Sequence, residues 1–251
     1  LIKHFRKLNK KIAIILVDPT SPYSSGAVLG DRIRMINHYD DEDVFIRSIA
    51  TRGSKGGLSN NIDEIADIFS AARYDIILFE TVGVGQVEVD VVEQVDSVIL
   101  TLVPESGDDI QMMKAGVVEI ADIFIINKSD RADANKLYTS IKNVLSLDSS
   151  NFGENEWIPS IIKTIATEDK GLNELVEKLI EHNSFINKQQ NILSSKQDQR
   201  YISKVKKILY DKINNEFWND NRKENLNIEI SKTSNQRISP FDFVEKLLKN
   251  E

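Results

Sequence analysis

The four residues Asn127-Lys128-Ser129-Asp130 form the most specific chemical pattern in the chain. In the pattern N-K-x-D, the aspartate carboxylate can accept two hydrogen bonds, from the ring N–H and the exocyclic amino group of guanine. Adenine does not present donors in that arrangement. The pattern follows residues 123–126, which are predicted to form a strand, and ligands of parallel sheets bind at the carboxyl ends of strands. The sequence therefore predicts a loop that selects guanine.

A second candidate site lies in residues 75–86, where an apolar run ends in Glu80 and is followed by Gly83 and Gly85. The run shows no polar alternation, which is typical of a strand buried on both faces. A carboxylate at its end can reach a hydrated Mg²⁺, and the N–H of a nearby glycine can meet a terminal phosphate. The alternative is a strand that ends in a surface glutamate and a flexible turn.

Two more acids are candidates for the same edge of the sheet. Asp18 follows the apolar run 12–17 and precedes Pro19, which cannot continue strand pairing. Asp31 begins a short helical stretch after a loop rich in Ser, Pro and Gly. Both could be ligands, or they could be ordinary acids at a strand end and a helix start.

Apolar runs alternate with amphipathic helical patterns along the first part of the chain, and short connections join them. Repeated strand and helix units of this kind predict an α/β fold with a mostly parallel sheet flanked by helices. The strands are expected at 12–17, 44–49, 75–80, 98–103, 123–126 and 161–166, and the helices at 1–9, 59–72, 112–120 and 171–181.

The chain changes character after residue 182. Residues 183–196 are polar, and the next segment carries an apolar stripe at helical spacing. A last short helix is expected with Ser239 as N-cap, Pro240 at its first position and Asp242 in the capping box. We therefore expect a domain over 1–182 and a helical extension over 183–251. The stripe needs an apolar partner, either the parent domain or a second copy in a homodimer.

Composition narrows the function classes. The 251 residues include no cysteine and carry a net charge of -7. Disulfides and thiolate metal sites are excluded, and a cytoplasmic location is the default expectation. No basic field suited to nucleic acid is visible, and no apolar run approaches the roughly 20 residues of a membrane span. The three histidines have no partners at ligand spacing, so no role is predicted for them.

The order of these motifs resembles that of the MeaB/ArgK-type GTPases, which chaperone methylmalonyl-CoA mutase and belong to the P-loop GTPases that deliver metals and cofactors. The resemblance covers about residues 1–182 and rests on four strings. They are Val17-Asp18-Pro19-Thr20-Ser21-Pro22, Leu29-Gly30-Asp31-Arg32-Ile33-Arg34-Met35, Glu80-Thr81-Val82-Gly83-Val84-Gly85-Gln86 and Asn127-Lys128-Ser129-Asp130.

The resemblance implies roles for the acids and the base-binding residues. Asp18 and Asp31 would belong to the first switch, and Glu80 and Gly83 to the second, with the three acids serving Mg²⁺ and catalysis. The string Ile165-Ala166-Thr167 aligns with the loop that touches the guanine carbonyl. The family usually has Ser-Ala there, so Ile165 departs from the pattern, although the contact normally comes from backbone N–H groups.

The resemblance also implies a partner. Residues 107–114 look like the family's third switch, which faces the mutase; its coupling residues would be Gly107, Asp108, Asp109, Gln111 and Lys114. The implied function is a Mg²⁺-dependent, GTP-binding and GTP-hydrolysing chaperone. It would assist an adenosylcobalamin-dependent acyl-CoA mutase in cofactor loading and protection.

One family feature is absent from the sequence. The Walker A loop, whose backbone N–H groups and Lys hold the phosphates, would lie before Leu1. Without it the chain should bind GTP poorly, so we interpret the chain as a fragment of a GTPase. The alternatives are a non-catalytic scaffold and a nickel-delivery metallochaperone. The latter needs Cys or His clusters, and the sequence contains none.

Overall fold

A computed structural model gives the fold of the chain as two compact units, Leu1–Lys196 and Gln197–Glu251. The predicted boundary after residue 182 lies earlier in the chain than this division. The structure describes residues 1–18, 35–50, 62–81, 94–104, 120–148 and 156–249.

The first sheet of unit 1 contains strands in the order β2-β1-β3, and all are parallel. In its register Leu16 lies opposite Glu80, and Asp18 lies opposite Ala50. The central strand is apolar and buried from Ile12 to Val17, which is why it forms the middle of the sheet. The strands are β1 (Ile12–Asp18), β2 (Val44–Ala50) and β3 (Ile76–Thr81).

The second sheet is also parallel, with the order β4-β5-β6, and its central strand is fully buried. The last strand ends at Lys163, earlier than the predicted end at residue 166. It stops there because the next residues bond to the loop after β5. The strands are β4 (Ile99–Leu102), β5 (Ile123–Ile126) and β6 (Ser160–Lys163). The predicted parallel α/β architecture is confirmed.

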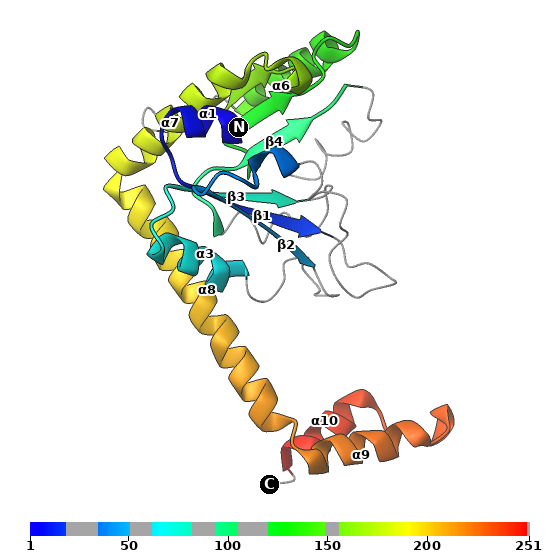
Figure 1. The fold of residues 1–251 in the computed structure, drawn as a ribbon. Helices are drawn as coiled ribbons and strands as arrows, with labels where there is room; N and C mark the ends of the chain where they lie inside the picture. The colour runs from blue at the N-terminus through cyan, green and yellow to red at the C-terminus, as the bar shows by residue number, and fades with distance from the viewer. Residues whose placement is uncertain (19–34, 51–61, 82–93, 105–119, 149–155, 250–251) are drawn as a thin grey trace. The chain divides into compact units, whose positions relative to one another are not determined.

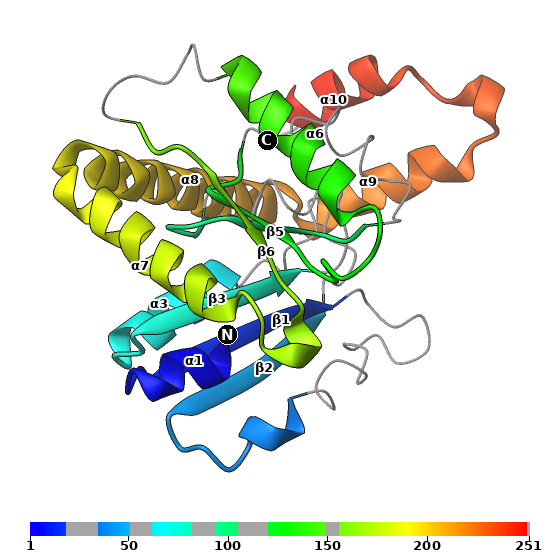
Figure 2. The same ribbon diagram turned by 90° about the horizontal axis from the view of Figure 1, so that it is seen from above.

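One helical layer joins the two sheets. The helices α1 (Ile2–Lys7) and α7 (Leu172–Lys188) lie against each other, as Figures 1 and 2 show. Leu1 and Leu179 pack against the apolar clusters of both sheets. The opposite face of the first sheet is covered by α3 (Ile62–Ala71), and that of the second by α6 (Ala134–Asp148).

The inner edges of the two sheets differ from their centres. Within the described residues, β3 and β4 each pair with a strand on one side only. Most of their side chains are half-buried, whereas those of β5 are fully buried. The arrows of β3 and β4 point toward the same side of unit 1 (Figure 1). The strand ends of both sheets therefore meet along one edge.

Two helices were not anticipated from the sequence, and a third is longer than expected. The helix α6 was not predicted, although Leu137 and Ile141 lie on one apolar face at helical spacing. The helix α7 continues past the predicted end at residue 181, because His182 and Ile186 are buried. Residues 183–188 of the polar segment lie in α7, and residues 190–196 begin the next helix.

Unit 2 is helical. Arg222 connects its elements, since its guanidinium lies 4.4 Å from the centroid of the Phe217 ring and its Nε donates to the Leu247 carbonyl at 3.3 Å. The predicted N-cap is confirmed, because the Asp242 N–H donates to Ser239 Oγ at 3.1 Å, and the Ser239 hydroxyl donates to the Asp242 carboxylate at 2.8 Å. The helices are α8 (Gln190–Phe217), which begins in unit 1, α9 (Asp220–Ser231), which was not predicted, and α10 (Pro240–Lys249).

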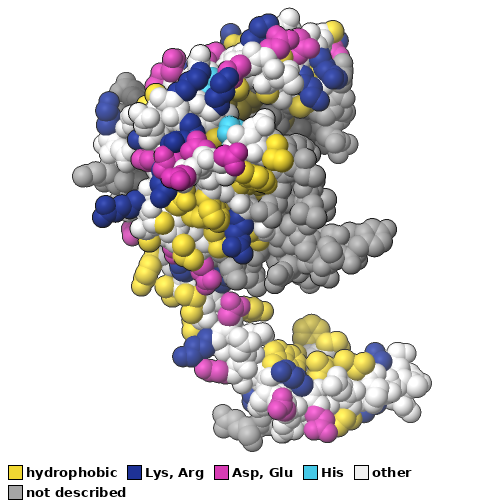
Figure 3. All heavy atoms as spheres, in the orientation of Figure 1, with side chains coloured by type: hydrophobic (Ala, Val, Ile, Leu, Met, Phe, Trp, Pro, Cys, Tyr) yellow, Lys and Arg dark blue, Asp and Glu magenta, His cyan; other side chains and the backbone are white. Residues whose placement is uncertain are grey.

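Apolar side chains remain exposed along the helices of unit 2, and Figure 3 shows some of them on one face. On α8 they include Ile202, Val205, Leu209 and Ile213, members of the predicted stripe. None of the helices in the described parts of the chain is long and apolar enough to cross a membrane.

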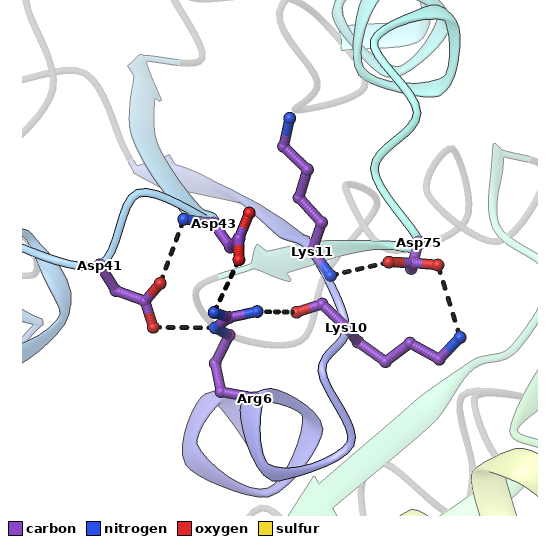
Figure 4. A network of polar contacts seen from close by, with 6 residues as sticks. All are labelled: Arg6, Lys10, Lys11, Asp41, Asp43 and Asp75. Atoms are coloured by element: carbon purple, nitrogen blue, oxygen red, sulfur yellow. Dashed lines mark hydrogen bonds and ion pairs between the residues drawn. The ribbon is translucent and has the colours of Figure 1, made fainter.

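A charged network fixes the starts of the strands in the first sheet, at the edge opposite the strand ends (Figure 4). From α1, Arg6 donates to Asp41 at 2.8 Å through Nε and to Asp43 at 2.8 Å through a terminal nitrogen. A third N–H donates to the Lys10 carbonyl at 2.8 Å. The hydrogen bond from Arg6 lowers the pKa of Asp41.

The same edge is held at β3 by Asp75. Its carboxylate accepts from the Lys11 backbone N–H at 2.8 Å and lies 3.4 Å from the Lys10 ammonium. The backbone hydrogen bond from Lys11 lowers the pKa of Asp75. Acids with a folded pKa below the unfolded value stabilise the fold above the unfolded pKa of about 3.9, and this stabilisation is lost as the pH falls through the folded pKa.

We predict that Arg6→Gln lowers the midpoint of thermal unfolding by about 2–4 °C at neutral pH. The difference from the parent should shrink below about pH 4, because protonation removes the charge that Arg6 compensates. Calorimetry between pH 3 and 7 measures the midpoints of thermal unfolding of the variant and the parent. Lys7→Gln is the matched control, since Lys7 lies exposed on the same helix. An equal loss in the control, or a loss that does not depend on pH, would contradict the prediction.

Candidate functional site

Asn127 connects the loop after β5 with the loop after β6. Its Oδ1 accepts from the Thr164 hydroxyl at 3.2 Å and from the Ala166 backbone N–H at 3.2 Å. Two backbone hydrogen bonds lie beside these side-chain contacts. The Thr164 N–H donates to the Ile126 carbonyl at 2.9 Å, and the Ser129 N–H donates to the Thr164 carbonyl at 3.1 Å. The two predicted base-binding segments are therefore brought together by direct hydrogen bonds.

Lys128 follows in a backbone conformation that side chains rarely adopt, with φ at 55°. A lysine there costs about 1 kcal/mol or more, and such strain persists only where the surrounding structure imposes it. The turn is closed by a hydrogen bond from Arg131 N to the Lys128 carbonyl at 3.1 Å. The side chain of Lys128 is exposed. Strain of this kind is concentrated at ligand sites, which favours a binding role for the turn.

Asp130 lies exposed at the end of this turn. The hydrogen bond to Glu168 is the main cause of the raised pKa of Lys170, and the negative charge of Asp130 adds to it. Asp130 therefore lies close enough to the loop after β6 for its charge to act there. A carboxylate in this position can accept hydrogen bonds from a ligand that enters between the two loops.

The loop after β6 is compact and closed at its base. Ile165 and Lys170 exchange two backbone hydrogen bonds, at 3.2 and 3.3 Å, around the short helix Ala166–Glu168. Thr167 is exposed, and no hydrogen bond from its N–H is found within the described residues. The Ala166 N–H is already used by Asn127. The Thr167 N–H is therefore the donor that this loop can offer to a ligand.

Gly171 ends this loop and begins α7 with φ at 77°. A Cβ there would lie 2.2 Å from the Lys163 carbonyl oxygen and 3.1 Å from the Thr164 methyl group. Only glycine lets the loop return this closely to the end of β6. Neither Gly171 nor Thr164 was predicted as a site residue. A glycine at the start of a predicted helix after a short loop is the signal that could have identified Gly171.

Of the predicted acids, Asp18 is the last residue of β1 and Glu80 lies one residue before the end of β3. Their strands are neighbours, and Glu80 is exposed. Oxygen ligands at the ends of adjacent strands match the preference of Mg²⁺. Asp31 and Gly83 lie outside the described residues, as do the predicted partner-coupling residues Gly107, Asp108, Asp109, Gln111 and Lys114. Within the described residues, no group of three His, Cys, Asp or Glu side chains is close enough to hold a metal ion.

Comparison with known proteins supplies the family. The model of the family described as methylmalonyl Co-A mutase-associated GTPase MeaB matches residues 1–222. The chain belongs to this family. The match continues beyond the predicted domain end at residue 182 into α8 and the start of α9. The members of the MeaB family are GTPases, and the predicted guanine-binding pattern agrees with that assignment.

Relatives of the chain are known from all three domains of life. A protein of Pyrococcus abyssi whose name places it among the GTPases is 41% identical over 99% of this chain and 76% of its own length. GTPase ArgK of Escherichia coli is 31% identical over 92% of this chain and 70% of its own length. The mitochondrial methylmalonic aciduria type A homolog of Mus musculus is 35% identical over 68% of this chain and 41% of its own length.

A solved structure has the same fold. The crystal structure of a LAO/AO transport system kinase matches with a TM-score of 0.65 and 24% identity, over 98% of this chain and 73% of that one. The P-loop NTPase-like architecture expected from the sequence is therefore confirmed. The chain spans about three quarters of that structure and of the Pyrococcus relative.

We predict that Gly171→Ala destabilises unit 1 by about 2 kcal/mol, because alanine must adopt a strained φ and displace the Lys163 carbonyl. The midpoint of thermal unfolding should fall by about 4–8 °C. Circular dichroism melting measures the loss. Leu172→Ala is the matched control at the next position, where the change removes side-chain packing without altering the turn. If Gly171→Ala unfolds at the temperature of the parent, the close approach at this turn is not required.

Proposed function

We propose that this MeaB-family protein binds GTP through the two loops joined by Asn127 and hydrolyses it with Mg²⁺. The observation that carries the proposal is the direct bond of Asn127 to Thr164 and Ala166 beside an exposed Asp130. These contacts shape a site in which acceptors come from one loop and a backbone donor comes from the other. That arrangement complements guanine, which presents donors at its ring N–H and amino group and an acceptor at its carbonyl.

Each side of the base would meet a different loop. The Asp130 carboxylate would accept from the ring N–H and the amino group, and the Thr167 N–H would donate to the carbonyl oxygen. Adenine would place its amino group against the Thr167 donor and offer no ring N–H to Asp130. The wrong base therefore leaves polar groups unpaired, which is the strongest source of discrimination at such sites.

The metal site is proposed at the ends of β1 and β3. Asp18, Asp31 and Glu80 would hold Mg²⁺ and the attacking water, and Gly83 would approach the terminal phosphate. Mg²⁺ bound there would neutralise charge on the phosphate oxygens as the bond breaks. The chain's own contribution is the strand register, which places Asp18 and Glu80 on neighbouring strands at one edge.

Every nucleotide test depends on whether the Walker A phosphate loop is present in the protein that is used. The 251 residues contain no G-x-x-x-x-G-K-[ST] pattern. The experiments below therefore use the full gene product, with any residues that precede Leu1. A non-catalytic scaffold is the alternative. A full gene product that binds no GTP would overturn the proposed GTPase and leave the scaffold as the alternative.

We further propose that the partner is an adenosylcobalamin-dependent acyl-CoA mutase. The name of the matching family and that of the mouse relative support this assignment. The protein would assist cofactor loading and protection, with residues 107–114 reporting the nucleotide state. A homodimer through unit 2 is also proposed. The exposed apolar stripe of α8 supports it, because such a surface gains stability when a second copy covers it.

The base assignment is tested by Asp130→Asn. Asparagine keeps one acceptor oxygen but places a donor amide against the amino group of guanine. The affinity for GTP should fall by more than about tenfold, which corresponds to one charged hydrogen bond replaced by a repulsive contact. Xanthosine triphosphate has a carbonyl in place of the amino group and should gain affinity. Isothermal calorimetry with GTP, ATP and xanthosine triphosphate measures both changes.

Asp133→Asn is the matched control for the loss of one negative charge. It lies beyond the turn and pairs with Lys136 at 2.8 Å. The nucleotide preference of this control should equal that of the parent. If the parent binds ATP and GTP equally well, the assignment of the base is wrong.

The partner proposal is tested with Asp108→Ala and Lys114→Ala. Basal GTP hydrolysis should stay within a fewfold of the parent, because these residues are not proposed to touch nucleotide. Most of the acceleration by the mutase should be lost, since the loop would no longer transmit the contact. A turnover assay with and without the mutase measures this, and Lys142→Ala on α6 is the control. Variants that respond to the mutase as the parent does would assign the coupling to another surface.

A further inference from the structure

His4 is a buried histidine to which the sequence assigned no role. It lies on α1 and is 5% exposed. Its Nε2 is 2.6 Å from Asp169 Oδ1, and its Nδ1 is 2.8 Å from Asn173 Oδ1. The ring therefore joins three elements: α1, the loop after β6, and the first turn of α7. Both ring nitrogens are used, so the orientation of the ring is determined on both sides.

Asp169 is the residue through which His4 reaches the base-binding loop. It directly follows the short helix that contains Ala166 and Thr167, and it adopts a left-handed backbone conformation with φ at 60°. Its N–H donates weakly to the Ala166 carbonyl at 3.4 Å. A strained residue next to a weak hydrogen bond needs a partner to keep its geometry. His4 supplies that partner, and its hydrogen bond is the main cause of the lowered pKa of Asp169.

The loop is thus held from two opposite sides. Asn127 holds the Ala166 N–H from the side of β5, and His4 holds Asp169 from the side of α1. Lys3 also reaches Asp169 at 3.3 Å, but its side chain is 64% exposed and such surface pairs contribute little. Between the two fixed points lies Thr167, whose N–H is the proposed donor to guanine.

We propose that His4 is a positioning residue for guanine recognition: through Asp169 it fixes the turn that points the Thr167 N–H at the base carbonyl. This inference rests on the proposed function, because it assigns a positioning residue to the same base site. His4 touches no nucleotide itself. It acts on the carbonyl side of guanine only, and the side read by Asp130 is independent of it.

A second buried histidine provides a matched control. His182 is 2% exposed, and its Nδ1 lies 2.7 Å from Ser97 Oγ while its Nε2 lies 3.2 Å from Asp122 Oδ1. Asp122 and Ser97 precede β5 and β4, so this cluster is at the strand starts, away from the base loops. Replacing His182 should remove as much buried hydrogen bonding as replacing His4, without moving the base site.

The test compares His4→Leu, His4→Gln and His182→Leu in the full gene product with three nucleotides. GTP is the reference. In 6-thio-GTP a larger sulfur atom, which is a weaker acceptor, replaces the carbonyl oxygen, and inosine triphosphate lacks only the amino group. In His4→Leu the preference for GTP over 6-thio-GTP should fall by about three- to tenfold, the value of one neutral hydrogen bond. The preference for GTP over inosine triphosphate should stay within twofold of the parent.

The two other variants separate positioning from stability. His4→Gln can still donate to Asp169 and should recover part of the preference over 6-thio-GTP. His182→Leu should lower the midpoint of thermal unfolding and leave both preferences unchanged. The inference is overturned if His4→Leu keeps the preference of the parent, or if both histidine variants lose it equally. If the parent itself shows no preference for GTP over ATP, the proposed function fails instead.

Discussion

The candidate site depends on one amide oxygen. Asn127 Oδ1 accepts from a hydroxyl and a backbone N–H of the loop after β6, and this places the two loops of the proposed base site at a fixed separation. Carboxylate and backbone groups can complement a base only if that separation is set before the ligand arrives, because ordering a loop during binding costs affinity. The left-handed Lys128 and Gly171 are the backbone conformations that this arrangement requires. Local strain is thus tolerated where the site needs it.

The helical layer gives the site its support. Two parallel sheets share α1 and α7 on one face, and Leu1 and Leu179 pack against the clusters of both sheets. The base site belongs to the second sheet and the candidate metal residues to the first. Within the described residues β3 and β4 do not pair with each other, whereas the shared layer packs against both sheets. His4 lies in that layer and contacts the base loop directly.

The two edges of the first sheet carry different groups of acids. At the strand starts, the charged side chains of Arg6, Asp41, Asp43 and Asp75 are paired with one another or with the backbone. At the strand ends, Asp18 and Glu80 come from neighbouring strands. Parallel sheets allow this division because all strands begin at one edge and end at the other. The acids at the first edge are paired in the fold, and those at the second are the acids proposed to serve Mg²⁺.

The sequence by itself determined the order of the strands along the chain and the parallel fold class, and it supplies the N-K-x-D pattern proposed to read guanine. These follow from short-range periodicity and from residue types at strand ends. The runs at β1 and β5 are apolar enough to specify buried strands whatever surrounds them.

Only the tertiary structure decided which distant residues meet. The contact of His4 with Asp169 joins residues far apart in the chain, and no local pattern specifies it. The same holds for Thr164 at Asn127, and for Gly171, whose need for glycine arises from the Lys163 carbonyl beside it. The helix α9 also escaped prediction, because it has no continuous apolar face from which to infer it. Contacts of this kind depend on how whole elements pack, and packing is a property of the folded chain.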